Sequence, residues 1–280
     1  MSRWVELADG VLARRYGELD LTVGLIIGDG ACLVVDTRGD AVQGAELAAA
    51  VREVTSAPWQ VAITHAHFDH CFGTAAFLPA AVWAHRRCAR ELAATGEQQR
   101  AQWQRYYTVQ GQAPFAAALA VAPLVPPDHP VDGRTELSIG GRRVVLAHLG
   151  AGHTDHDLVV WLPDDATVFA GDLVEHGAPP DFGDAFPLAW PSTVDRLLAL
   201  GAATLVPGHG DPVGAGFVRA QRDELAAVAA LCHRMLDGEP ARDLVCASPY
   251  PPDTTRTALA RAATHDRADG HDRADGPSAQ

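Results

Sequence analysis

The sequence predicts an α/β protein, and three observations support this class. Short apolar runs rich in Val, Ile and Leu recur along the chain, Ala-rich segments with helical spacing separate them, and 48% of the 280 residues are hydrophobic. The length is sufficient for a large buried core, and we expect residues 1–260 to form one domain.

The first part of the chain reads as strands, a helix and a further strand. Residues 21–28 and 31–37 are apolar runs separated by an Asp-Gly turn. Residues 41–54 have helical spacing and an Ala-rich composition. Residues 59–67 form another apolar run, which leads directly into a cluster of histidines. We therefore expect this cluster in a loop at the carboxyl end of a strand, a common place for sites in α/β proteins.

The second part continues the alternation. Strands are predicted at residues 142–150, 157–163, 167–172 and 203–210, and helices at 191–201 and 220–238. Residues 86–120 read as an irregular helical segment, which either covers one side of the site or forms a surface insert. The repeated sequence HDRADG makes residues 261–280 polar and without an apolar period, so we expect a disordered tail there.

Composition limits the partners and the location. A formal net charge of -13 argues against nucleic acid, which requires a basic surface. The chain shows neither a signal peptide nor an apolar run long enough to cross a membrane. Five scattered cysteines without a C-x-x-C pair make a disulfide framework improbable and favour the cytoplasm. Cys71, directly after the histidine cluster, is a candidate to line the site, although a small buried residue is the favoured interpretation.

The cluster itself is the stretch THAHFDH, which contains His65, His67, Asp69 and His70. Imidazole nitrogens and carboxylate oxygens are ligands that zinc accepts. In an extended segment His65 and His67 point the same way, because the side-chain period is two. Asp69 and His70 lie beyond them, where a turn can direct them at a second point. The stretch therefore predicts two neighbouring metal ions, each of which still needs further ligands.

Three residues at predicted strand ends can complete the set: His153 in GAGHTDH, Asp172 in FAGDLV and His209 in VPGHGD. A carboxylate such as Asp172 can bridge two metals with one oxygen each. One metal would be held by His65, His67, His153 and Asp172. The other would be held by Asp69, His70, His209 and Asp172.

These motifs, together with Asp36 in VVDT, resemble the motifs of the metallo-β-lactamase fold superfamily in their residue types and in their order along the chain. The resemblance covers roughly residues 20–215. The resemblance implies an αββα sandwich of two mixed β-sheets flanked by helices, with two Zn²⁺ ions at one edge; iron or manganese are the alternatives. It also implies that Asp36 orients the histidine loop without binding metal itself.

The expected chemistry is hydrolysis. Two divalent ions lower the pKa of a shared water from 15.7 to about 7, and the resulting hydroxide attacks a carbonyl or a similar electrophile. Asp69 is the expected catalytic residue, because it can hold the proton of the nucleophile. The expected partner is a small molecule with an ester, lactone, thioester or amide bond.

The substrate side departs from known branches of the superfamily. True β-lactamases of the resembling subclass have Cys at the position of Asp172, often Lys at Glu175 and Asn at Asp181. Glu175 and Asp181 should repel an anionic β-lactam, and His176 on the same segment is a further candidate to reach the site. The lactonase branch often has Tyr at Glu175, the thioesterase branch favours GHTPGH over GHTDHD, and the nuclease branch has an inserted domain and a basic surface.

Three alternatives stay open at this point. One is a β-lactamase-type hydrolase, and another is an iron-dependent oxidoreductase similar to the persulfide dioxygenases of this fold. The third is a metal-holding module without activity, against which the complete ligand set argues. The remaining histidines are expected to serve surface or core packing, and the oligomeric state stays open.

Overall fold

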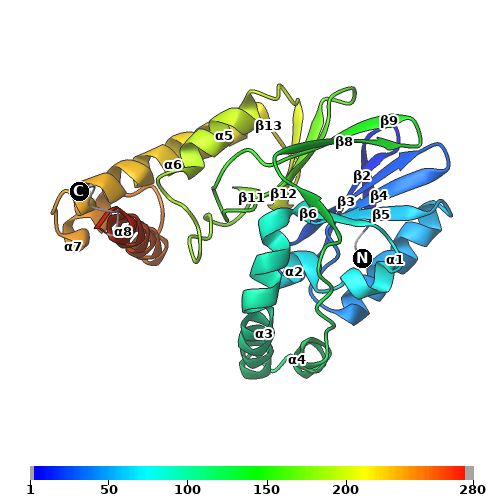
Figure 1. Ribbon diagram of the computed structural model, residues 1–280, viewed down its shortest axis with the longest axis horizontal. Helices are drawn as coiled ribbons and strands as arrows, with labels where there is room; N and C mark the ends of the chain where they lie inside the picture. Colours follow the sequence, from blue (N-terminus) through cyan, green and yellow to red (C-terminus); the bar gives the residue numbers. More distant parts are fainter. Residues whose placement is uncertain (1–2, 275–280) are drawn as a thin grey trace, which may run out of the picture.

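The computed structural model describes residues 3–274 and shows two β-sheets packed face to face between layers of helices (Figure 1). The first sheet has the order β1-β2-β3-β4-β5-β6-β7. Its strands are β1 (Trp4–Ala8), β2 (Val11–Arg15), β3 (Thr22–Gly28), β4 (Ala31–Val35), β5 (Trp59–Ala62), β6 (Val82–His85) and β7 (His129–Val131). The first four strands pair antiparallel and the last four parallel, so the sheet is mixed.

The second sheet has the order β13-β12-β11-β10-β9-β8. Its strands are β8 (Arg134–Ile139), β9 (Arg142–Ala147), β10 (Val159–Leu162), β11 (Thr167–Glu175), β12 (Thr204–His209) and β13 (Val213–Gly214). Only β11 and β12 pair parallel, and this sheet is therefore mixed as well. The expected αββα sandwich of two mixed sheets is confirmed.

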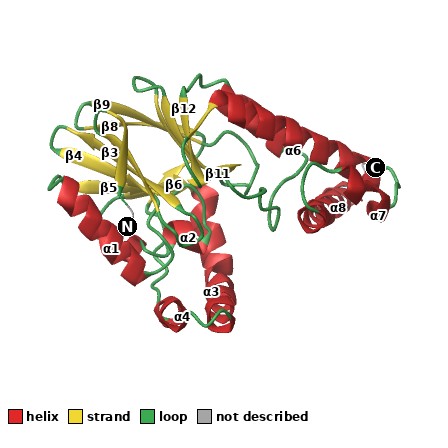
Figure 2. Ribbon diagram, turned by 180° about the vertical axis from the view of Figure 1, so that it is seen from behind, coloured by secondary structure: helices red, strands yellow, loops and turns green. Residues whose placement is uncertain are grey.

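Helices connect and cover the strands. They are α1 (Ala41–Val54), α2 (Phe68–Cys71), α3 (Arg86–Val109), α4 (Ala113–Ala120), α5 (Trp190–Leu198), α6 (Ala215–Leu236), α7 (Ala241–Leu244) and α8 (Pro252–Ala274), with the short turns η1 (Thr74–Phe77) and η2 (Val245–Ala247). Figure 2 shows α6 extending away from the sheets toward α7 and α8. None of the helices in the described part of the chain is long and apolar enough to cross a membrane.

Strand alternation explains the layers. Leu25 packs in the cluster that α1 joins, whereas its neighbour Ile26 packs between the two sheets. The second sheet likewise packs against α5 and α6 on its outer side through residues such as Val168 and Val194. Strands such as β4 and β11 are thus buried on both faces, which is the reason that they read as continuous apolar runs. All five cysteines are free.

The C-terminal segment differs from the expected disordered tail. Helix α8 continues to Ala274, so residues 261–274 are helical and the expected domain end at residue 260 falls inside a helix. Alanines favour the helix, and Ala258, Leu259 and Ala262 are buried in the cluster that contains α6. Packing of the first half of α8 therefore overrides the polar composition of the repeat. Residues 275–280 lie outside the described residues.

Candidate metal centre

The seven expected ligands come from both sheets and meet at one edge of the sandwich. His65 and His67 lie in the extended segment after β5, and Asp69 and His70 lie in α2. The second sheet supplies the others: His153 from the loop between β9 and β10, Asp172 from within β11, and His209 from the end of β12. Ligand atoms from these residues lie within 4.8 Å of one another in each of two groups.

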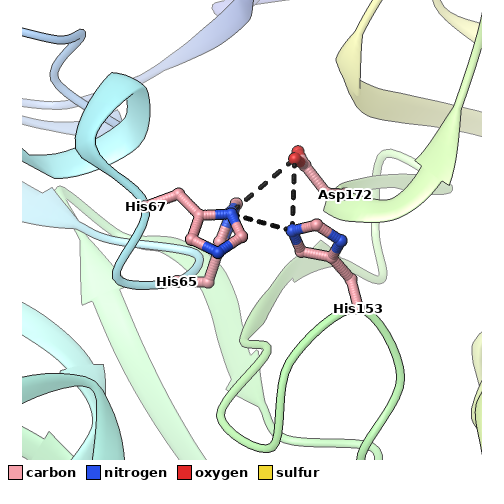
Figure 3. Close-up of side chains that lie close together, drawn as sticks. All are labelled: His65, His67, His153 and Asp172. Carbon is pink, nitrogen blue, oxygen red and sulfur yellow. Dashed lines mark hydrogen bonds and ion pairs between the residues drawn. The ribbon is translucent and has the colours of Figure 1, made fainter. Parts of the chain in front are cut away.

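The first group joins His65, His67, His153 and Asp172, whose side chains converge in Figure 3. His67 Nδ1 lies 3.0 Å from His153 Nε2. Asp172 Oδ2 lies 3.6 Å from His65 Nε2 and 3.6 Å from His153 Nε2. Three imidazoles and a carboxylate oxygen thus surround one point, as the sequence predicts for the first metal.

The second group joins Asp69, His70 and His209. The two Nε2 atoms are 3.4 Å apart, and Asp69 Oδ2 lies 3.7 Å from that of His70 and 3.5 Å from that of His209. Asp172 reaches this group too, because Oδ1 lies 3.2 Å from His70 Nε2 and Oδ2 lies 3.3 Å from His209 Nε2. Asp172 therefore lies between the groups, in the position that a bridging carboxylate requires.

The backbone beside Asp172 must be glycine. A Cβ atom added to Gly208 would lie 1.8 Å from Asp172 Oδ1, which no side chain can tolerate. The parallel pairing of β11 with β12 brings Gly208 to this place, one residue before the ligand His209. Gly208 thus leaves space for the carboxylate between the two groups.

Each of the five histidines has one ring nitrogen held by a polar partner, which leaves the other nitrogen directed at the centre. The partners are Thr64 Oγ1 for His65 Nδ1, Asp184 Oδ2 for His67 Nε2, Asp36 Oδ2 for His70 Nδ1, the Asp181 carbonyl for His153 Nδ1 and the Leu19 carbonyl for His209 Nδ1, at 2.8–3.3 Å. These contacts fix both the ring orientation and the tautomer that metal binding needs.

Asp36 occupies the organising position that the sequence indicates. It follows β4, is buried, and adopts a φ of 64°, which is uncommon for a residue other than glycine. Its carboxylate accepts hydrogen bonds from the Thr64 amide and the Thr64 hydroxyl, each at 2.8 Å, and lies 2.8 Å from His70 Nδ1. Asp36 is not a member of either group. It holds His70 of the second group directly, and it holds His65 of the first group through the Thr64 hydroxyl, which lies 3.0 Å from His65 Nδ1.

The electrostatics of the site depend on buried charge. Burial lowers the pKa of His65 well below its usual value. Burial also opposes the charged form of His67 and His209, but the carboxylates of Asp184 and Asp172 outweigh it and raise these pKa values to about 9 and about 10. Burial raises the pKa of Asp172, yet the neighbouring histidines outweigh it and hold that pKa well below the usual range.

These residues fit two divalent cations. His65 Nε2 and Asp172 Oδ1 are buried atoms without a hydrogen-bond partner among the described residues, and both face the centre. Such atoms are costly unless a ligand satisfies them. The donor set of imidazoles and carboxylates suits zinc, manganese or iron, and sharing Asp172 gives each group four protein ligands.

A cavity of about 690 Å³ opens above the centre. Glu175, His176 and Asp181 all line it, and so do Asp69 and Asp172. Helix α3 forms one wall of the cavity, so this part of residues 86–120 covers one side of the site and is not a surface insert. On α3, Gln99 accepts a hydrogen bond from the Phe68 amide and donates one to the Ala66 carbonyl, so this helix also holds the histidine loop.

Two features of the site were not expected from the sequence. Asp184, which holds His67, follows the noted Asp181 by three residues in a loop without any periodic pattern. Two main-chain carbonyls, of Leu19 and Asp181, hold the other rings, and no sequence pattern marks them. Cys71 is buried in the core and does not line the cavity, in line with the favoured interpretation. Of the remaining histidines, His156 Nε2 accepts a hydrogen bond from the Ala66 amide.

Known proteins share both sequence and fold with this chain. The family model of the metallo-beta-lactamase superfamily matches residues 16–209. A protein named metallo-beta-lactamase type 2 from Bacteroides fragilis is 34% identical over 90 residues, which are 30% of this chain and 36% of that protein. Metallo-beta-lactamase IND-1 from Chryseobacterium indologenes is 36% identical over 85 residues, or 29% of this chain and 36% of that protein. The matches therefore span about a third of the length of these curated relatives.

Solved structures extend the likeness over the fold. A metallo-beta-lactamase from Pontibacter korlensis superposes with a TM-score of 0.64 and 20% identity, covering 81% of this chain and 99% of that chain. The mono-zinc form of the metallo-beta-lactamase FIM-1 from Pseudomonas aeruginosa gives a TM-score of 0.63 and 20% identity, covering 81% and 96%. Because the family model covers most of the sandwich and all seven converging residues, the chain belongs to the metallo-β-lactamase superfamily.

Proposed function

We propose that the protein is a metal-dependent hydrolase that holds two divalent cations, with zinc as the first candidate, and cleaves a small-molecule ester, lactone, thioester or amide. The observation that carries the proposal is the pair of ligand groups that share Asp172 beneath a cavity of about 690 Å³. The seven residues of the two groups would hold the cations, and the chemistry supplied with them would be a hydroxide near neutral pH and polarisation of the scissile carbonyl.

The protein's own residues contribute position and proton transfer. Asp69 belongs to the second group through Oδ2 and also lines the cavity, so its carboxylate is placed to orient the attacking water and accept its proton. Asp36, Asp184 and Thr64 keep the histidine rings in one orientation, so the ligands need little rearrangement when substrate binds. Helix α3 covers one side of the cavity and limits access of bulk water.

Metal analysis combined with a hydrolase panel tests the proposal. After reconstitution with excess zinc, we expect two metals per chain by elemental analysis and zinc-dependent turnover of at least one class among esters, lactones, thioesters and amides. Manganese and iron are loaded in parallel, because an iron-dependent oxidoreductase would be active only with iron and would consume oxygen. One metal or none after reconstitution, or no zinc-dependent hydrolysis, would contradict the proposal. A cytoplasmic location stays a prediction for cell fractionation.

β-Lactam hydrolysis is the second candidate, because the relatives that match are named metallo-beta-lactamases. The cavity argues against it as the main activity, since Glu175 and Asp181 line it and the sequence contains no lysine to pair with an anionic substrate. A carboxylate at about 4–8 Å from a bound anion repels it by on the order of 2–4 kcal/mol at an effective dielectric near 20.

Replacing both acids tests the second candidate. Glu175→Lys combined with Asp181→Asn should raise kcat/KM on a carboxylate-bearing β-lactam by about tenfold or more. The gain on a neutral ester of similar size should be smaller. Strong β-lactam turnover by the unmodified protein, measured in the same steady-state assay, would show that these two charges do not control access.

A further inference from the structure

The walls of the cavity have an unbalanced charge. No arginine lines the cavity among the described residues, and the sequence has no lysine. The acidic side chains in the lining are Asp20, Asp69, Glu91, Asp172, Glu175, Asp181 and Asp184. Asp69 and Asp172 belong to the candidate metal centre, Asp184 contacts His67, and Asp20 pairs with Arg15. Glu91, Glu175 and Asp181 form no ion pair with an arginine among the described residues.

Glu175 is the most informative of the three. It is the last residue of β11 and is only 7% exposed, yet no side chain or amide of residues 3–274 donates a hydrogen bond to its carboxylate. The carboxylate lies within 4.8 Å of ligand atoms of Asp172 and His209, beside the centre. Because Glu175 lines the cavity, its carboxylate is open to a ligand there, and a positively charged group bound beside it would offset the repulsion from the neighbouring Asp172 carboxylate.

Bound metal ions do not supply all of that missing charge. Two divalent ions held by the carboxylates of Asp69 and Asp172, together with one hydroxide, have a net charge of about +1. The three remaining carboxylates exceed it, so the loaded cavity stays negative. A neutral substrate would leave this charge uncompensated, and an anionic one would add to it.

The opposite wall suits an organic cation. Residues Glu91, Thr95, Gln98, Gln99, Gln102 and Trp103 of α3 line the cavity with helical spacing, so they form one face of the helix. The Trp103 ring stacks on Phe68, with centroids 4.3 Å apart, directly beside Asp69. Aromatic rings and carboxylates together are the surroundings in which ammonium groups bind favourably.

We propose that the substrate carries a positively charged organic group, an ammonium or guanidinium, which binds in this cavity with Glu175 as its inner partner. The proposal rests on the proposed hydrolase function and narrows its substrate class. Glu175 acts as a specificity-determining residue, and Asp181 and Glu91 add negative potential farther from the metal centre.

Two isosteric esters test the charge preference. The p-nitrophenyl esters of 4-(trimethylammonio)butyrate and of 5,5-dimethylhexanoate differ only in one quaternary nitrogen against carbon, and the glutarate monoester supplies an anion. We expect kcat/KM to be about tenfold or more higher for the cation than for its neutral isostere, and lowest for the anion. Equal kcat/KM for the cationic and neutral esters would overturn the proposal.

The Glu175→Gln variant tests whether Glu175 causes the preference for the cationic ester. It keeps the size of the side chain, so the ratio of kcat/KM for the cationic ester to kcat/KM for the neutral ester should fall by about tenfold. Glu97→Gln is the matched control, because Glu97 lies on α3, is exposed and does not line the cavity. Metal content is measured on each variant. Loss of a metal from Glu175→Gln would make Glu175 a ligand and overturn its assignment here, as would an equal fall on both esters.

Binding measurements distinguish a failure of this proposal from a failure of the proposed hydrolase function, because they need no turnover. If none of the esters is hydrolysed, hydrolysis of this bond class fails. Calorimetry with the two product acids still tests the charge preference, because both have the same carboxylate. Tighter binding of the trimethylammonio acid, lost in Glu175→Gln, supports the proposal, and equal Kd values overturn it.

Discussion

Asp172 is the one residue that belongs to both ligand groups. Its Oδ1 lies 3.2 Å from His70 Nε2 and its Oδ2 lies 3.6 Å from His65 Nε2, so one side chain serves both groups. In Asp172→Ala each group loses a ligand, and the negative charge between the two proposed metal sites disappears. We expect metal content to fall from two per chain to one or less, and hydrolysis to fall by more than about 100-fold, since even outer contacts to metal ligands are worth 10–100-fold.

Asp223→Ala provides the control for this prediction, because Asp223 is exposed on α6, away from the centre. Elemental analysis and steady-state kinetics are run on both variants. Retention of two metals with near-normal turnover in Asp172→Ala would rule out the bridging assignment.

The histidine pKa values predict how metal binding depends on pH. In the metal-free chain the pKa of His67 rises from 6.5 to about 9, and that of His209 to about 10. Because folding raises both pKa values, protonation of the two histidines stabilises the metal-free fold. This contribution to the free energy of unfolding is fully present below pH 6.5 and is lost as the pH rises through 9 and 10. Metal must displace the same protons.

We therefore expect apparent zinc affinity to increase from pH 6.5 to 9.5, by up to about tenfold per pH unit for each proton released. Over the same range the Tm of the metal-free protein should decrease. Chelator competition and thermal unfolding measure the two trends, and a zinc affinity that is independent of pH would contradict the tautomer assignments.

At the scale of elements, α8 reaches the candidate metal centre from outside the family-matched region. Arg261 donates hydrogen bonds to the Asp184 carbonyl at 2.6 Å and to the Ala185 carbonyl at 3.2 Å. Asp184 in turn holds His67, and the Phe186 amide in the same loop donates to the Gly152 carbonyl beside His153. The C-terminal helix thus supports the loop that positions two ligands of the first group.

Arg261→Ala should consequently lower zinc affinity at the first group by about tenfold, the range known for outer contacts of metal ligands. Arg261→Lys should restore part of it. Arg256→Ala is the matched control, because Arg256 lies on the same helix, is exposed and pairs with Asp253 rather than with the Asp184 loop. Zinc competition and far-UV circular dichroism are compared, so that a loss of helix is distinguished from a loss of affinity. Unchanged affinity in Arg261→Ala would show that α8 does not position the site.

The elements also show what could be predicted from sequence. The ligands were predictable because His65, His67, Asp69 and His70 are close in sequence and the others follow apolar strands. The contacts that hold the rings were not, because they come from loops and main-chain carbonyls whose position depends on tertiary packing. The helical character of residues 261–274 was missed for a similar reason, since polar composition does not reveal burial of the preceding turns against α6.

For the whole molecule, the αββα fold was predictable at the level of class and family. The apolar runs indicated strands, and the order of the motifs resembled that of a family whose fold is an αββα sandwich. The strand order within each sheet and the cavity wall formed by α3 required the structure, because no local pattern in residues 86–109 states which face meets the site. The unbalanced charge of the cavity likewise emerges only when residues far apart in sequence are brought together.

Each sheet is built from one uninterrupted part of the chain, with the boundary at Gly133 between β7 and β8. The N-terminal part contributes His65, His67, Asp69 and His70, and the C-terminal part contributes His153, Asp172 and His209. A chain divided at Gly133 would therefore yield two halves, neither of which can complete a metal site alone. We expect the two co-expressed halves to bind each other more tightly in the presence of zinc than in the presence of a chelator. Analytical ultracentrifugation measures this difference, and the metal would then act as a reversible cross-link between the halves.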